Sequence, residues 1–228
     1  DGRTEIMAID AERMRLIEAT SSGFFPTEVT FQASGVWGGE VIDSDGDGFQ
    51  EMFLRSSRAE QFRVFEAKGD DQFVQVGTLI NPSEGLDGLG ERQVVADFDG
   101  DGWGELLSGD EDGDVFIYES IADDTWRNNW MFRNENGDSR VVGGGFDTDG
   151  DNRLEFLVAG LQVNEFDLSR TQWTVTLFEA VEDNRYSEQW SAEIIGGASG
   201  ANGIAAGDFD GDGTPEIAVA LVPNLYLF

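Results

Sequence analysis

The chain of 228 residues contains no cysteine and no histidine, and Lys68 is its only lysine. Without cysteine, disulfide bonds are excluded, and cysteine usage does not indicate whether the protein works in an oxidising or a reducing compartment. Without histidine, the chain lacks the most common general base at neutral pH and the most common ligand of transition metals. Ser–His–Asp and Cys–His catalysis are therefore excluded within this chain.

Long apolar runs and basic residues are also scarce. No stretch approaches the roughly 20 apolar residues that span a bilayer, and no secretory signal is visible. The 14 Lys and Arg residues face 46 Asp and Glu residues, which gives a formal net charge of −32. This balance argues against nucleic-acid binding, which needs a basic face, and suits high salt or a load of divalent cations. A hydrophobic content of 39% nevertheless indicates a folded protein.

An acidic repeat is what the sequence has in abundance. The stretch "ADFDGDGWGEL" (96–106) places aspartates at alternate positions and closes with a glutamate. The same pattern recurs as "IDSDGDGFQEM" (42–52), "FDTDGDNRLEF" (146–156) and "GDFDGDGTPEI" (207–217), and "DGRTEI" (1–6) matches the second half of a fifth copy. A period of roughly 50 to 60 residues indicates a repeat architecture.

Strand-like segments recur with the acidic loop. A small apolar segment precedes each loop, and a second apolar segment follows it. The repeat then continues with an apolar run that ends in glutamate. Turn-type residues and an aromatic residue complete it. These glutamates are Glu18, Glu66, Glu119 and Glu179, and the aromatic residues are Phe25, Phe73, Trp126 and Tyr186. Four antiparallel strands per repeat, with no amphipathic helix, predict an all-β fold, namely a β-propeller of four-stranded antiparallel blades. Glycine and alanine in the first strand suit the crowded centre of a propeller.

The repeat boundaries predict that residues 1–228 form one partial β-propeller. An incomplete blade is expected over 1–35, complete blades over about 36–92, 93–140 and 141–202, and another incomplete blade over 203–228. The two incomplete ends overlap in strand type and so cannot merge into one blade. We therefore expect a section of a larger ring whose remaining blades lie outside this chain.

The acidic loops have the chemistry of a calcium site. Ca²⁺ takes six to eight hard oxygen ligands, which carboxylates at alternate positions of a tight loop can supply. Loop residue seven varies freely, as expected if it donates only its backbone carbonyl. Glycine at residue four, and glycine or asparagine at residue six, predict positive φ angles. The predicted metal ligands are Asp43, Asp45, Asp47, Phe49, Glu51; Asp97, Asp99, Asp101, Trp103, Glu105; Asp147, Asp149, Asp151, Arg153, Glu155; Asp208, Asp210, Asp212, Thr214, Glu216; and Asp1 and Glu5 of the truncated copy.

Two other interpretations of these loops are weaker. One Asp-Gly dipeptide usually marks a hairpin turn, but four copies with every acid in register favour a cation site. An EF-hand needs an acid at loop residue twelve and helices on both sides. Residue twelve is Leu54, Ser108, Val158 or Val219. Mg²⁺ is less suited to a site made by protein alone, so Ca²⁺ is the expected cofactor at four complete loops and a fifth, truncated one.

The pattern D-x-D-x-D-G-x-x-E, followed by "ELL" or "EIAVA", resembles the FG-GAP/VCBS-type repeat family. Integrin α-subunit propellers and many secreted bacterial proteins carry similar loops. The literal Phe-Gly and Gly-Ala-Pro signatures are absent, which favours the bacterial VCBS-like branch. The resemblance implies a propeller, often seven-bladed, with calcium between strands one and two of each blade, an extracellular or cell-surface location, and a binding or scaffolding role.

Our leading hypothesis is a non-enzymatic adhesion, protein-binding or scaffold module, because metal ligation accounts for the clustered carboxylates. A lectin-like glycan binder is the second hypothesis, and the propeller of a polysaccharide lyase is the third. Trp103, on a loop, is the tryptophan that we expect to be exposed and able to stack on sugars.

We expect a protein or glycan partner on the face opposite the calcium loops, where the repeat has its insertions at 81–92 and 161–172. The alternative, that these are only longer solvated loops, remains open at this point. The stretch "GDEDGD" (109–114) predicts a plain acidic turn, because the ninth residue counted from Asp110 is Tyr118.

Overall fold

The computed structural model describes residues 4–10, 13–18, 29–57, 60–85, 88–134, 138–139, 141–162, 171–195 and 201–228. All regular secondary structure in these ranges is β-strand, which confirms the predicted all-β class. Within the same ranges there is consequently no helix of the length and apolarity that crossing a membrane requires.

Eighteen strands in the described residues form five antiparallel sheets. The first sheet contains β1 (Glu5–Asp10), β2 (Arg13–Glu18) and β3 (Val29–Ser34). The second contains β4 (Val36–Ile42), β5 (Glu51–Ser56), β6 (Gln61–Gly69) and β7 (Gln72–Ile80). The third contains β8 (Leu89–Ala96), β9 (Glu105–Asp110), β10 (Asp114–Ala122) and β11 (Thr125–Arg133). The fourth contains β12 (Val141–Phe146), β13 (Glu155–Gln162), β14 (Gln172–Glu182) and β15 (Arg185–Ile195), and the fifth β16 (Ala201–Gly207), β17 (Glu216–Leu221) and β18 (Asn224–Leu227).

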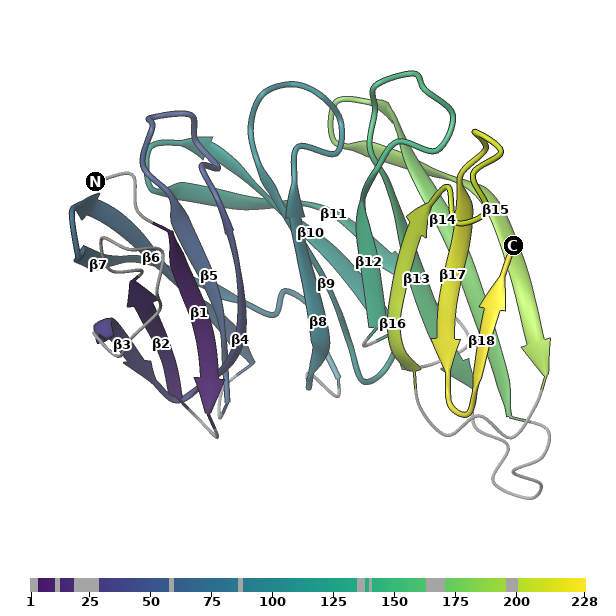
Figure 1. The fold of residues 1–228 in the computed structure, drawn as a ribbon, viewed down its shortest axis with the longest axis horizontal. Coiled ribbons are helices and arrows are strands. Elements are labelled where there is room, and N and C mark those ends of the chain that lie inside the picture. Colours follow the sequence, from purple (N-terminus) through teal and green to yellow (C-terminus); the bar gives the residue numbers. More distant parts are fainter. Residues whose placement is uncertain are drawn as a thin grey trace.

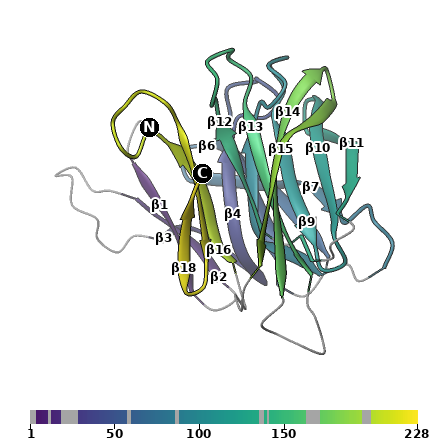
Figure 2. The same ribbon diagram turned by 90° about the vertical axis from the view of Figure 1, so that its right-hand side faces the viewer.

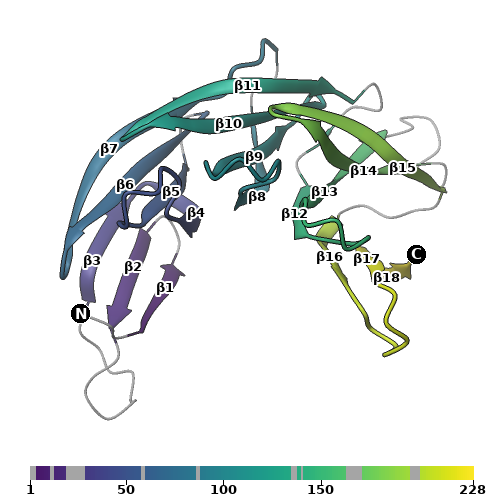
Figure 3. The ribbon, with the colours of Figure 1, turned by 90° about the horizontal axis from the view of Figure 1, so that it is seen from above.

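Each sheet is a meander in which strands pair in chain order, so every sheet is local in sequence. The sheets stand side by side in an open arc, with β4, β8, β12 and β16 on its concave side and β7, β11 and β15 on its outer side (Figures 1 and 3). Figure 2 shows the molecule from the side that carries β18. In this view the strands run between the top and the bottom of the molecule, and the connections between strands lie there. The arrangement is that of propeller blades, and the described residues do not close a ring.

The strands β8 and β16 begin slightly before the expected boundaries at residues 93 and 203. Their first residues already pair with the following strand, since Leu89 is opposite Asp110 and Ala201 is opposite Leu221.

Close packing explains the glycine in the innermost strands. A Cβ atom added at Gly143 of β12 would lie 2.9 Å from the Cβ of Ile204 in β16, the innermost strand of the next sheet. At Gly144 it would lie 2.7 Å from the Cβ of Phe156 in β13. Real Cβ atoms are not found so close, so these positions require residues without a side chain. The predicted crowding at the concave side is therefore present.

Aromatic side chains fill the space between neighbouring sheets. Phe156 of β13 is fully buried and stacks on Phe178, with ring centroids 5.3 Å apart. It also meets Phe98, Trp130 and Tyr186 edge to face, with centroids 5.3, 5.7 and 5.3 Å away. Phe98 and Trp130 come from the β8–β11 sheet, so this cluster joins two sheets. Such aromatic contacts hold the neighbouring sheets at a fixed angle and thereby position the loops at their ends.

Candidate metal centre

The four complete acidic loops connect β4 to β5, β8 to β9, β12 to β13 and β16 to β17. Loop residue four has a positive φ in every copy, with values of 75°, 80°, 84° and 82° at Gly46, Gly100, Gly150 and Gly211. Loop residue six does too, with 93°, 95°, 71° and 93° at Gly48, Gly102, Asn152 and Gly213. These are the conformations predicted from the glycine pattern, and they coil the chain around its own aspartates.

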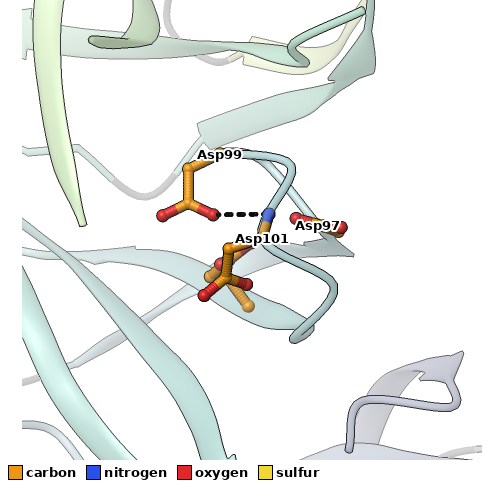
Figure 4. A group of neighbouring side chains, drawn as sticks. Asp97, Asp99 and Asp101 are labelled. Atoms are coloured by element: carbon orange, nitrogen blue, oxygen red, sulfur yellow. Dashed lines mark hydrogen bonds between the residues drawn. The ribbon is translucent and has the colours of Figure 1, made fainter. Parts of the chain in front are cut away.

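Backbone N–H groups hold the aspartates of each loop in place. In the loop at 97–105, Asp97 accepts hydrogen bonds from the amides of Gly100 (2.7 Å) and Gly102 (3.0 Å). Asp99 accepts one from the amide of Asp101 at 3.3 Å, and Asp101 accepts one from Trp103 at 2.8 Å. The three carboxylates are thus arranged around one turn (Figure 4). The other three loops show the same bonds at Asp43, Asp45 and Asp47, at Asp147, Asp149 and Asp151, and at Asp208, Asp210 and Asp212.

The closing glutamate of each loop turns back toward loop residue two. Its Oε2 accepts the backbone N–H of that residue, at 2.6 Å from Ser44 to Glu51 and 2.6 Å from Phe98 to Glu105. Both glutamates are fully buried, and their Oε1 atoms have no hydrogen-bond partner among the described residues. The bonds are repeated from Thr148 to Glu155 and from Phe209 to Glu216. A buried carboxylate oxygen without a partner is costly, and a cation would satisfy it.

Electrostatics agree with this need for a cation. Burial, together with the charges of the neighbouring loop aspartates, raises the pKa of Glu51 to about 7 and that of Glu105 to about 9. Burial likewise raises the pKa of Glu155 above its ordinary value, and that of Asp99. Without a cation, the ionised form of these acids is disfavoured because they share a small, partly desolvated volume.

The carboxylates converge closely enough to share one ion. Oxygen atoms of Asp97, Asp99, Asp101 and Glu105 all lie within 4.8 Å of one another, as do those of Asp208, Asp210, Asp212 and Glu216, and those of Asp43, Asp45 and Glu51. Acid-only clusters with an orphaned buried oxygen fit a hard cation such as Ca²⁺, which binds oxygen ligands at about 2.3–2.6 Å. The residues present therefore fit the ion predicted from the sequence.

No pattern in the sequence indicates that the next sheet contacts two of these loops. The hairpin turn between β10 and β11 reaches the preceding sheet, where the amide of Asp124 donates to Asp45 Oδ2 at 3.0 Å. One sheet further along, the amide of Asn184 in the β14–β15 turn donates to Asp99 Oδ2 at 2.7 Å. Asp124 and Asn184 share a left-handed conformation, with φ of 53° and 56°. Loop residue three is therefore held by two sheets.

The loops also contact one another along the arc. The amide of Gly104 donates to the carbonyl of Ser44 at 2.8 Å, and the amide of Leu154 donates to the carbonyl of Phe98 at 3.3 Å. Each bond joins loop residue eight in one sheet to loop residue two in the preceding sheet. The candidate metal centres at 43–51, 97–105 and 147–155 thus form a connected row on one face.

The remaining predicted ligands have different outcomes. Asp1 lies outside the described residues, and Glu5 begins β1 opposite Glu18 of β2. Phe49, Trp103, Arg153 and Thr214 each donate their backbone N–H to the aspartate at loop residue five. That their carbonyls bind metal stays a prediction.

Trp103 is not the exposed tryptophan that the sequence suggested. It is half-buried, whereas Trp37 in β4 has 49% of its surface exposed. The guanidinium of Arg55 lies 5.2 Å from the Trp37 ring centroid. The prediction was wrong because a loop position was taken as a sign of exposure, while the more exposed of these two tryptophans, Trp37, lies in a strand.

In the acidic turn at 109–114, protein donors bind both carboxylate oxygens of Asp110. Asp110 Oδ2 accepts hydrogen bonds from Asn81 Nδ2 (3.0 Å) and Ser83 Oγ (2.7 Å), and its Oδ1 accepts the amide of Asp114 (2.9 Å). Arg133 pairs with Asp114 at 3.1 Å. This network supports the interpretation as a structural turn. It also places the β7–β8 connection beside the β9–β10 turn, at the end opposite the acidic loops.

Comparisons with known proteins agree with the repeat. A family model described as an FG-GAP-like repeat matches residues 43–108 and 147–219, more than half of the chain. No curated protein sequence matches the chain. One similar solved structure is described as "Crystal structure of BBS1N in complex with ARL6DN, soaked with lead"; the match has a TM-score of 0.45 and 10% identity and covers 100% of this chain and 75% of that chain. A likeness this distant supports no inference about function.

Proposed function

Since the chain belongs to the FG-GAP-like repeat family, we propose that it is an extracellular, calcium-binding β-propeller module that binds a protein partner in adhesion or scaffolding and catalyses no reaction. One observation carries the calcium assignment. Four loops adopt the same geometry, and in two of them a fully buried glutamate presents an oxygen without a partner to a cluster of carboxylates. The VCBS-like branch remains our preferred subdivision of the family.

The role proposed for calcium is structural rather than catalytic. The closing glutamates are held by backbone amides, and the loop aspartates are held by amides of their own loop and of the next sheet. Carboxylates held in place in this way suit the ligands of a permanently bound ion. An ion in each loop would bind acids that otherwise repel one another and would thereby stabilise the row of contacts between neighbouring sheets.

The proposed partner surface lies at the end opposite the loops. Two isoleucines at the ends of outer strands are unusually exposed there, Ile80 of β7 at 62% and Ile195 of β15 at 68%. They occupy equivalent positions in two sheets, since Ile80 pairs with Gln61 and Ile195 with Gln172. This recurrence of an exposed apolar side chain at equivalent positions supports the proposal that partners bind at this end. Most of the insertion at 161–172 lies outside the described residues.

Calcium titration of the metal-free protein tests the first part of the proposal. Protein treated with EGTA, and shown to be metal-free, should bind Ca²⁺ in isothermal titration calorimetry and gain thermal stability from it. Asp99→Ala should weaken one site and leave the others, because Asp99 serves a single loop and the turn that contacts it. Mg²⁺ at the same concentration should give a smaller shift. An unchanged melting curve on adding Ca²⁺ would contradict the assignment.

A glycan array and a turnover assay test the second part. A lectin-like propeller needs shallow aromatic pockets repeated from blade to blade. The hairpin aromatics described here point inward instead, with Trp126 packed on Phe53 and Tyr186 on Trp130. We therefore expect no saturable binding to glycans and no cleavage of acidic polysaccharides. Saturable binding to one glycan class would favour the lectin hypothesis, and turnover would favour the lyase.

A further inference from the structure

A second glutamate lies opposite the closing glutamate of three complete acidic loops and of the truncated copy. The pairs in register on neighbouring strands are Glu5 with Glu18, Glu51 with Glu66, and Glu105 with Glu119. In the fourth sheet Phe156 pairs with Phe178, which places Glu155 and Glu179 next on the same ladder. Like charges directly opposite each other on neighbouring strands destabilise a sheet, so a fourfold recurrence calls for a compensating charge.

The second sheet shows this pair at its most buried. Glu51 is 0% exposed and Glu66 is 1% exposed, and the Oε1 atom of each has no hydrogen-bond partner among the described residues. Oxygens of Asp47, Glu51 and Glu66 lie within 4.8 Å of one another. The Nζ atom of Lys68 forms an ion pair with the Oε2 atom of Glu66. The lysine thus leaves one oxygen of Glu66, and one of Glu51, facing the loop acids.

The other sheets bring the same groups together. Asn184 donates its Nδ2 to Glu119 at 2.9 Å and its backbone amide to Asp99 at 2.7 Å, so one residue joins the strand-three glutamate of the third sheet to the acidic loop. In the fourth sheet, Arg153 of the loop donates a guanidinium N–H to the carbonyl of Ala180, next to Glu179, at 2.8 Å. In both sheets, therefore, the strand-three glutamate lies beside the acidic loop.

We propose that the strand-three glutamates Glu66, Glu119 and Glu179 are further ligands of the divalent cation held by the acidic loop of the same sheet. This inference rests on the calcium binding proposed above. Each site would then take carboxylates from the loop and from the neighbouring strand, and one ion would neutralise both members of the buried glutamate pair. Glu119 already accepts hydrogen bonds from Asn184 Nδ2 (2.9 Å) and Asn129 Nδ2, but a carboxylate has about four lone-pair positions and can also bind a metal.

The site in the second sheet can be followed separately from the others. The indole Nε1 of Trp126 donates to Ser44 Oγ at 3.3 Å, and Ser44 is residue two of the loop at 43–51. A terbium ion in this loop would therefore be sensitised by Trp126. Trp126→Phe should remove that part of the luminescence and so assign the signal to this loop.

The decisive variant is Glu66→Gln, which keeps the size of the side chain and removes its charge. In EGTA the variant should melt at the same temperature as the wild type or higher, because the repulsion between Glu51 and Glu66 is gone. In saturating Ca²⁺ its gain in melting temperature should be smaller. Calorimetry should show one site weakened at least tenfold, and terbium luminescence sensitised by Trp126 should need more terbium to saturate.

Two control variants separate ligation from a purely structural role. Lys68→Gln removes the ion-pair partner and leaves the glutamate, so its Ca²⁺ affinity should be unchanged or higher. Glu182→Gln removes an exposed acid that pairs with Arg185 at 2.9 Å and should change neither measurement. If Glu66 served only its ion pair, Glu66→Gln and Lys68→Gln would lower the melting temperature in EGTA alike and leave Ca²⁺ binding intact. That result would overturn the inference.

The fourth sheet offers an independent repetition if Glu66→Gln does not fold. Glu179 is only half-buried, so Glu179→Gln is expected to be tolerated and again to weaken one site. Failure of the wild type to bind Ca²⁺ would refute the calcium assignment and this inference together. Normal Ca²⁺ binding by both glutamine variants would refute this inference alone.

Discussion

In the absence of calcium, raising the pH from 5 to 9 should destabilise the protein. The pKa of Glu105 rises from 4.5 to about 9 in the folded protein, and that of Glu51 from 4.5 to about 7. Between its unfolded and folded pKa values, each glutamate holds a proton in the folded state and has lost it in the unfolded state. Stability from a raised pKa is complete below pH 4.5 and is lost as the pH rises to the folded pKa. The loss should therefore extend to about pH 7 for Glu51 and to about pH 9 for Glu105.

The size of this loss follows from the shifts. One pKa unit corresponds to about 1.4 kcal/mol, so Glu105 contributes at most about 6 kcal/mol and Glu51 at most about 3 kcal/mol. Both side chains are 0% exposed, so neither carboxyl group contacts bulk water directly. Losses of this size approach the whole stability of a typical domain, about 5–15 kcal/mol. Calcium should reverse the trend, because the cation stabilises the ionised carboxylates and needs them deprotonated.

Urea unfolding followed by tryptophan fluorescence, at each pH in EGTA and in Ca²⁺, measures this dependence. Glu105→Gln imitates the protonated acid, so in EGTA the variant should lose stability less steeply between pH 5 and 9 than the wild type. Glu182→Gln, which alters an exposed acid, should keep the wild-type slope. A wild-type curve that is flat in EGTA, or equal slopes for Glu105→Gln and the wild type, would refute the reasoning.

Three further outcomes are expected. Phe156→Ala should lower the free energy of unfolding by about 3–5 kcal/mol in urea titrations, because it opens a cavity between two sheets. Gly109→Ala should cost about 1–3 kcal/mol in the same assay, since its Cβ would lie 2.0 Å from the carbonyl oxygen of Ser139. Replacing residues 163–170 with a short glycine–serine turn should abolish partner binding measured by surface plasmon resonance while leaving the calcium-induced rise in melting temperature; unchanged binding would argue against the proposed partner surface.

Much of the architecture could be predicted because each feature of the repeat is specified by residues that lie close together in the sequence. Glycine or asparagine at loop residues four and six specifies positive φ, and the loop then coils as its hydrogen bonds show. Glutamate, turn residues and an aromatic residue specify the outer hairpin, and Trp126 indeed pairs with Ser120 across it. Each of these features depends on neighbours a few residues away, which is why the sequence alone was sufficient.

The rest of the site depends on distances that local patterns do not contain. The recurring glutamate of strand three was visible, but its position opposite the loop glutamate depends on the register between strands two and three. The turn between these strands differs in length from sheet to sheet, so the spacing of Glu51 and Glu66 differs from that of Glu155 and Glu179. The contact of Asp124 with Asp45 depends on the angle between whole sheets, which the bulk of buried aromatic residues sets.

The bonds that link successive loops provide two natural probes of how the sheets come apart. The amide hydrogens of Gly104 and Leu154 are bound by carbonyl groups of the preceding sheet and not by their own. Their hydrogen–deuterium exchange therefore reports the separation of two sheets, whereas exchange within β9 or β13 reports unfolding of a single sheet. The main contacts between sheets in the described residues join neighbours along the arc, so these two events can differ in free energy. Comparing the two exchange rates with and without calcium would show whether the ions hold the sheets to one another or hold each sheet folded.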